Sequence, residues 1–231
     1  MEYILNGIND AFRMIFSLNA EVLSAVSVSL MVSTVAIFLA ILLGLPLGFI
    51  IGTNSFFGKK TIITIMNTLL AVPTVFIGLM VYSFICRRGL LGNFGLLYTP
   101  WAMIIGQTIL AFPIVSALTL SAVSSIDRRI EKTALSLGAN KRQVAVCILT
   151  EARFAIFSAI IVAFGRVFSE VGISMLLGGN IRYLTRNITT TIVLETGKGE
   201  FALGIALGIV LLTVALLINI VFSYLQSKKS S

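Results

Sequence analysis

The longest stretches without a charged residue constrain this chain most strongly. Residues 22–58, 61–86, 89–126 and 201–227 contain no Asp, Glu, Lys or Arg, and only two charges interrupt residues 154–181. A helix needs about 20 apolar residues to cross the hydrocarbon core of a bilayer. Charged residues make up 11% of the chain, against about 25% in soluble domains, and hydrophobic residues make up 58%. We therefore predict an integral membrane protein with a single membrane domain over residues 1–231.

The apolar runs predict an all-α fold, a bundle of about five transmembrane helices with an additional interfacial helix near the N-terminus. Each run is longer than one crossing, so part of it must lie at the interface or in loops. The predicted crossings are residues 24–52, 63–86, 101–125, 154–177 and 202–225.

Residues 4–18 have a different pattern. Apolar residues recur on one side at helical spacing, while polar residues fall on another, which is typical of a helix lying in the membrane interface. A sixth crossing is the alternative, but it would bring four polar residues into lipid at high cost. The apolar side holds Ile4, Ile8, Phe12 and Ile15, and the four polar residues are Asn6, Asn9, Asp10 and Arg13.

The positive charges predict the orientation of five crossings. The loop at 53–62, the segment 127–153 and the tail after 225 carry ten Lys and Arg residues, whereas the segments predicted for the other side carry six. Basic residues favour the cytoplasmic side. We therefore expect the N-terminus outside and the C-terminus in the cytoplasm of a prokaryotic plasma (inner) membrane.

Composition also limits the chemistry. The net charge is +8, but the basic residues cluster at the ends of apolar runs, as in membrane topology rather than nucleic-acid binding. The chain has no histidine, and Cys86 and Cys147 are expected at opposite faces of the membrane, unpaired. We expect no metal site, no nucleic-acid partner and no catalytic residue.

The charged segment 127–150 stands out between two crossings. Asp127 can cap a helix, Glu131 complements the helix dipole, and Ile130, Ala134 and Leu137 follow at helical spacing. Gly138 allows a tight turn before a second helix. These features predict a helix, a turn and a second helix. Such an elbow could fill a groove in a soluble partner or simply rest on the bilayer.

The same segment resembles the EAA loop of ABC importer permeases. In "EKTALSLGANKRQVAVCIL" the matching positions are Glu131, Ala134 and Gly138, with "ILT" at 148–150. Lys132 and Thr133 depart from the family's small residues. The later segment "AFGRVFSEVGISMLLGGNIRYLTRNITTTI" resembles permeases of the molybdate and tungstate branch. The likeness covers most of the chain from about residue 24, and tungstate-uptake permeases look most similar; molybdate or another oxyanion is the alternative.

This resemblance implies a type I importer permease fold and several partners. A second copy of the chain would complete the pore, and a dimer of separate ATPase subunits would dock on the elbow. A periplasmic or lipoprotein binding protein would deliver the oxyanion. The chain lacks the Gly-x-x-x-x-Gly-Lys-[Ser/Thr] phosphate loop, so ATP would be used by the partner and no cofactor bound here. The elbow residues expected to contact the ATPase are Glu131, Ala134, Leu137, Gly138 and Ala139.

Arg166 and Glu170 are the two charges inside a predicted crossing. They are four residues apart, so they can pair on one helix face. Arg166 could contact the oxyanion, but a paired arginine is less available, and a deep positive site would trap a dianion. We therefore favour a structural pair. The sequence alone assigns no substrate-binding residue.

Small residues and prolines recur within the crossings. Gly44, Gly48 and Gly52 are spaced by four, which predicts close helix packing. Pro73 and Pro113 are expected to interrupt the second and third crossings.

Two other classes of protein fit the sequence less well. A self-contained secondary transporter would show internal repeats and mid-membrane carboxylates, and only Glu170 fits the latter. An intramembrane enzyme would need a nucleophile with its base or a pair of acids, which the sequence does not offer.

Overall fold

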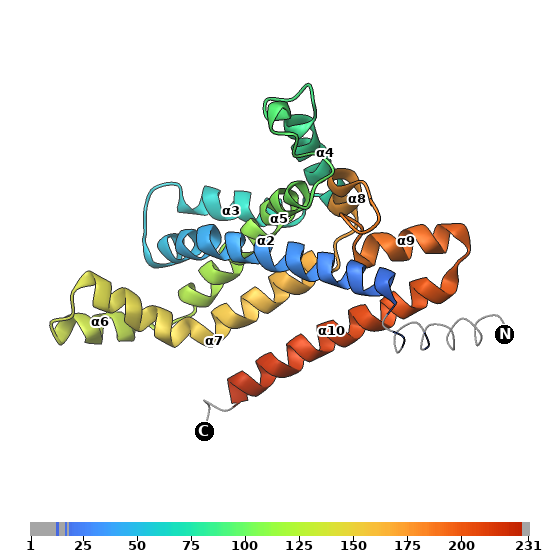
Figure 1. Ribbon diagram of the computed structural model, residues 1–231. Helices are drawn as coiled ribbons and strands as arrows, with labels where there is room; N and C mark the ends of the chain where they lie inside the picture. Colours follow the sequence, from blue (N-terminus) through green and yellow to red (C-terminus); the bar gives the residue numbers. More distant parts are fainter. Residues whose placement is uncertain (1–12, 14–16, 18, 228–231) are drawn as a thin grey trace.

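The computed structural model describes residues 13, 17 and 19–227, and every regular element within 19–227 is helical. The helix predicted at 4–18 lies almost wholly outside this part and stays a prediction. The bundle has α6 at one end and α9 at the other (Figure 1). In chain order the elements are α2 Ala20–Thr53, α3 Lys59–Leu70, α4 Thr74–Ile85, the 3-10 helix η1 Gly92–Phe94, α5 Pro100–Ser124, α6 Arg128–Ser136, α7 Lys141–Phe168, α8 Gly172–Gly178, α9 Ile188–Lys198 and α10 Phe201–Ser227.

Four helices in the described part, α2, α5, α7 and α10, are long and apolar enough to cross a membrane. The pair α3 and α4 makes a fifth crossing if the two are counted together. The count agrees with the predicted bundle of about five. The core lies where α2, α5 and α7 meet, around Ala36, Ala40, Ala111 and Ala163.

The predicted helix 63–86 is broken. α3 and α4 are bent by 97° at the segment 71–73. Pro73 lacks an N–H and disfavours helical backbone at the residue before it, so the helix ends and a new one starts. Pro46 and Pro113, in contrast, lie inside continuous helices, so the interruption expected at Pro113 was wrong.

The crossing predicted at 154–177 has other bounds. α7 starts at Lys141, so the second helix of the elbow and the crossing form one helix of 28 residues. It ends at Phe168, and the chain turns through Ser169 and Glu170 into the short α8. The sequence pattern did not reveal this break because both sides of it are equally apolar.

Glycines bring α2 and α5 together as predicted. A Cβ on Gly48 would come within 2.8 Å of Thr119 Cβ and would clash with the Ser116 carbonyl, and one on Gly44 would lie 2.9 Å from Ser116 Oγ. Real Cβ atoms do not approach so closely, so a side chain at Gly44 would require Ser116 to shift, and one at Gly48 would require the backbone of α5 to move. The two backbones pack at a distance that only small residues allow.

The segment after α8 forms the helix α9, whose first turn is buried. Ile188, Thr190 and Thr191 are fully buried, and α9 packs against α2 and α10. Asn187 caps the helix by accepting from the Thr190 N–H at 2.9 Å. α10 then runs back along the bundle towards the α6 end (Figure 1).

Candidate functional site

The elbow at 127–150 has the predicted helix–turn–helix form. Asp127 Oδ1 accepts from the Arg129 N–H at 2.8 Å and caps α6. Gly138 has φ of +83°, a backbone conformation that favours glycine, and it turns the chain. Asn140 and Gln143 exchange side-chain to backbone hydrogen bonds and cap α7. The start of each of the two helices is therefore fixed by a side chain.

The five elbow residues named from sequence lie on different sides. Ala134 and Ala139 are half-buried and pack inward near Val144 and Ile148 of α7. Leu137, predicted to share a face with Ala134, is 82% exposed. That detail of the prediction was wrong, because α6 ends at Ser136 and Leu137 lies beyond the helical repeat. Glu131 and Gly138 are also exposed.

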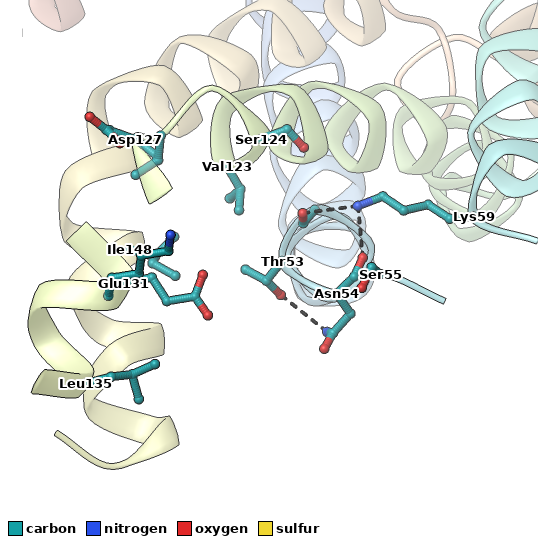
Figure 2. Close-up of a pocket in the computed structure, with 13 residues that line it drawn as sticks. Thr53, Asn54, Ser55, Lys59, Val123, Ser124, Asp127, Glu131, Leu135 and Ile148 are labelled. Carbon is teal, nitrogen blue, oxygen red and sulfur yellow. Dashed lines mark hydrogen bonds between the residues drawn. The ribbon is translucent and has the colours of Figure 1, made fainter. Parts of the chain in front are cut away.

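A polar cavity of about 560 Å³ separates α6 from the end of α2. Glu131 and Leu135 point from α6 towards Thr53 (Figure 2). On the far wall, Lys59 Nζ donates to the carbonyls of Asn54 at 2.9 Å and Gly52 at 3.3 Å. A lysine at this place complements the negative end of α2. Sequence analysis missed both the cavity and Lys59, since nothing in the chain order shows that 52–59 faces α6.

Arg166 and Glu170 pair as predicted, with 2.9 Å between Arg166 Nη1 and Glu170 Oε2. The other carboxylate oxygen, Oε1, accepts from the backbone N–H groups of Gly172 at 2.9 Å and Ile173 at 3.3 Å. The carbonyl of Glu170 accepts from the Thr189 hydroxyl at 2.8 Å. Glu170 therefore ties together the end of α7, the start of α8 and the start of α9.

The two members of the pair differ in exposure. The side chain of Glu170 is 3% exposed and that of Arg166 is 46% exposed. The acid is buried in the bundle, while part of the guanidinium faces out of the described chain. The spacing of four residues predicted the pair but not this asymmetry.

A second charge cluster lies at the α9 end. Glu21 of α2 bonds Arg186 at 2.8 Å and Arg182 at 3.1 Å. These contacts fasten the start of α2 to the turn between α8 and α9. They escaped sequence analysis because the partners are some 160 residues apart.

Cys86 and Cys147 are both free, as expected.

Membrane-length helices around an apolar core, with a capped polar elbow at one end, define a multi-pass membrane subunit rather than a soluble enzyme. The chain belongs to a family described as "Binding-protein-dependent transport system inner membrane component", whose model matches residues 44–231. It is thus a multi-pass inner-membrane transport component, and the predicted likeness to ABC importer permeases is confirmed.

Two relatives resemble the chain over nearly its whole length. The tungstate uptake system permease protein TupB of Campylobacter jejuni is 43% identical and aligns with 96% of this chain and 92% of that protein. TupB of Peptoclostridium acidaminophilum is 39% identical and aligns with 99% of this chain and 100% of that protein. The molybdenum transport permease ModB of Escherichia coli (strain K12) is more distant, at 25% identity over 76% of this chain and 81% of that protein.

Solved structures share the fold. A chain of the MetNI methionine ABC transporter in inward-facing form superposes with a TM-score of 0.73 at 16% identity, covering 89% of this chain and 94% of that chain. A chain of a bacterial ABC transporter that imports alginate gives a TM-score of 0.76 at 19% identity, covering 100% and 91%. At such identity the likeness establishes the fold alone.

Proposed function

We propose that this chain is the permease subunit of an ABC importer and conducts tungstate into the cell. The observation that carries the proposal is the identity of 39–43% to two tungstate uptake permeases over nearly the whole chain. Relatives named for molybdenum transport stand at 24–28%. Molybdate is therefore the second candidate substrate.

In this proposal the elbow transmits force. α6 faces the cytoplasm, with the C-terminus on the same side and the N-terminus outside, as the basic residues indicate. An ATPase dimer docks on Glu131, Leu137 and Gly138. Leu137 supports this role, because a leucine 82% exposed beyond the end of a helix suits a groove in a partner. Ala134 and Ala139 hold α6 against α7, so a push on α6 reaches the crossing directly.

The chain itself is proposed to be non-catalytic. ATP hydrolysis belongs to the separate ATPase, since the sequence has no phosphate loop. A second copy completes the pore, and an external binding protein delivers the anion at the α9 end. The solved alginate transporter was captured with its periplasmic protein, which supports this kind of partner.

Uptake measurements test the proposal. Tungsten and molybdenum accumulation is measured by mass spectrometry in cells with and without the gene, and in cells whose partner ATPase is inactivated. We expect tungsten uptake to need both the permease and ATP hydrolysis, and to persist in excess molybdate. Uptake by the purified chain alone, driven by an ion gradient, would instead establish a secondary transporter. If excess molybdate abolished tungsten uptake, both anions would be substrates of the importer.

A single substitution tests the elbow. Leu137→Glu places a charge on an exposed side chain, so the protein should still insert and fold, but the ATPase should no longer copurify. Leu216→Glu is not a fair control, because it would place a charge in lipid. Thr133→Glu, also exposed on α6 but absent from the proposed contact, is the matched control. If the ATPase copurified normally with the Leu137 variant, Leu137 would not be part of the contact.

A further inference from the structure

One face of α7 is covered by nothing in the described chain. α7 packs against α2, α5 and α10, and near its start against α6, and its remaining side is open. The open face repeats at intervals of three and four, the spacing of one helix side. Apart from one exposed valine it consists of small or weakly polar residues and one arginine, and its members are Ala155, Ser158, Val162, Gly165, Arg166 and Ser169.

This face is unlike a surface made for lipid. α10 shows such a surface, since its exposed residues include Leu212, Leu216, Leu217 and Ile220. A charged group facing hydrocarbon is costly, so intramembrane arginines face polar surroundings. The open face of α7 therefore faces water or a protein surface.

Gly165 lies in the middle of this face. Glycine within a helix is destabilising relative to alanine. Gly44 and Gly48 are needed for contact with α5, whereas a Cβ on Gly165 would meet no atom within 4 Å. Packing within this chain does not require a glycine here. Gly208 on α10 is open in the same way, so Gly165 keeps this face open while Arg166 indicates what lies against it.

Arg166 supplies hydrogen-bond donors to this face. Its guanidinium carries five N–H donors in a planar fork, and the bond to Glu170 uses Nη1. In residues 19–227 this is the one side-chain hydrogen bond found for Arg166, and the side chain is 46% exposed on the open face. A fork of this kind matches tetrahedral oxyanions by paired hydrogen bonds.

Glu170 makes the contact weak enough for conduction. A lone buried arginine would hold a dianion too tightly, and conduction requires that an ion bind and leave easily. The carboxylate at 2.9 Å offsets part of the positive charge, and it is itself held by the N–H groups of Gly172 and Ile173. The pair thus presents a partly neutralised donor group rather than a full charge.

We propose that the open face of α7 lines the anion path and that Arg166 is a transient contact for a tetrahedral oxyanion passing along it. This inference rests on the proposed function and names a residue for it. Glu170 positions Arg166 and anchors α8 and α9. The sequence favoured a structural role for the pair. That role is now assigned to Glu170, whereas Arg166 contacts the anion.

A double substitution separates the two roles. Arg166→Gln alone leaves the buried Glu170 charge without its partner, so it tests stability and transport together. Arg166→Gln with Glu170→Gln keeps the interior neutral and leaves an amide oxygen to accept from Gly172. The assembled complex is reconstituted in proteoliposomes, and we measure tungstate import, ATP hydrolysis stimulated by the binding protein, and assembly by size-exclusion chromatography.

We expect the double variant to assemble and to hydrolyse ATP at close to the normal rate. Its tungstate import should fall roughly 10- to 100-fold, the effect of losing one charge-assisted hydrogen bond at a step that limits passage. Arg166→Lys should retain part of the import. Normal import by the double variant would overturn the proposal, since Arg166 would then serve only to neutralise Glu170. Loss of ATP hydrolysis as well would place the pair in coupling to the ATPase rather than in the anion path, which would overturn this inference and leave the proposed function standing.

Thiol labelling tests the path even if these variants fail to assemble. In a chain carrying Cys86→Ser and Cys147→Ser, Val162→Cys reports the open face and Leu216→Cys on α10 is the lipid-facing control. An anionic sulfonate reagent should modify the Val162 variant and spare the control, and tungstate should slow the reaction. An unreactive Val162 variant would overturn the proposal. Crosslinking between two copies at this position, without anion protection, would make the face a contact between subunits instead.

Discussion

The contact between α2 and α5 and the open face of α7 both contain small residues, yet the structure uses them differently. At Gly44 and Gly48 a side chain would strike α5, so the space beside each glycine is filled within the chain. At Gly165 that space is empty. The same residue type therefore has its packing partner inside the chain in one place and, by our inference, outside it in the other. A small residue in a membrane helix can mark a contact within the chain or a contact with another molecule, and only the neighbouring atoms distinguish the two cases.

The largest effect is expected inside the α2–α5 contact. Gly48→Ala would force apart two backbones, since the added Cβ meets the Ser116 carbonyl and Thr119 Cβ. Overpacking of this kind costs about 3 kcal/mol. We expect a much lower yield of folded protein and a lower thermal midpoint in detergent. Gly208→Ala on α10, with no atom within 4 Å, is the control and should be tolerated. Equal stability of the two variants would show that the contact can relax.

The next effect concerns the buried half of the charge pair. Glu170→Ala would leave the N–H groups of Gly172 and Ile173 and the guanidinium of Arg166 without their acceptor. Losing such a buried acceptor should lower the free energy of unfolding by about 2–4 kcal/mol. Glu195→Ala removes another buried acid, whose carboxylate pairs with Lys198, and should cost less. Thermal unfolding of the purified chains gives the comparison, and a reversed order would argue against Glu170 as an anchor.

A smaller effect is expected at two turns near the α6 end. Gly138 and Gly58 have φ of +83° and +87°, and a Cβ added at either position would meet no atom within 4 Å. Alanine at either should cost about 1 kcal/mol from backbone strain alone. We expect equal losses of thermal stability, but weaker stimulation of the partner ATPase only for Gly138→Ala. Equal stimulation in both variants would contradict the role of the elbow turn.

The smallest effect, with the opposite sign, is expected at Gly165. Gly165→Ala should stabilise the isolated chain by up to about 1 kcal/mol through helix propensity, because the methyl group meets nothing. In the assembled importer the same change should slow tungstate transport. A thermal midpoint measured with the chain alone, followed by uptake in proteoliposomes, checks both parts. Faster or unchanged transport would mean that nothing passes or packs closely there.

Local patterns in the sequence predicted much of the fold. The charge-free runs indicated a helical bundle of about five crossings, and Asp127 and Gly138 indicated the elbow. The spacing of Arg166 and Glu170 predicted their pairing. These features depend on lipid compatibility and on interactions between residues close in the chain, so they can be inferred without tertiary structure.

Other features depended on neighbours distant in sequence. The end of α7 at Phe168 follows from Glu170 capping α8 and bonding Thr189, and the apolar composition does not mark it. The cavity between α6 and the end of α2 joins segments some 70 residues apart. The bonds of Glu21 to Arg182 and Arg186 span still more of the chain.

The sequence by itself determined that this chain belongs in a membrane, where its polar elbow lies between two crossings, and which two charges pair within an apolar segment. Only the tertiary structure decided which side of each helix is covered, and hence that Glu170 is enclosed while Arg166 is open. The physical reason is that in an apolar span nearly every residue is compatible with lipid. Hydrophobicity therefore fixes the depth of a helix in the membrane, while its rotation is fixed by contacts with other helices.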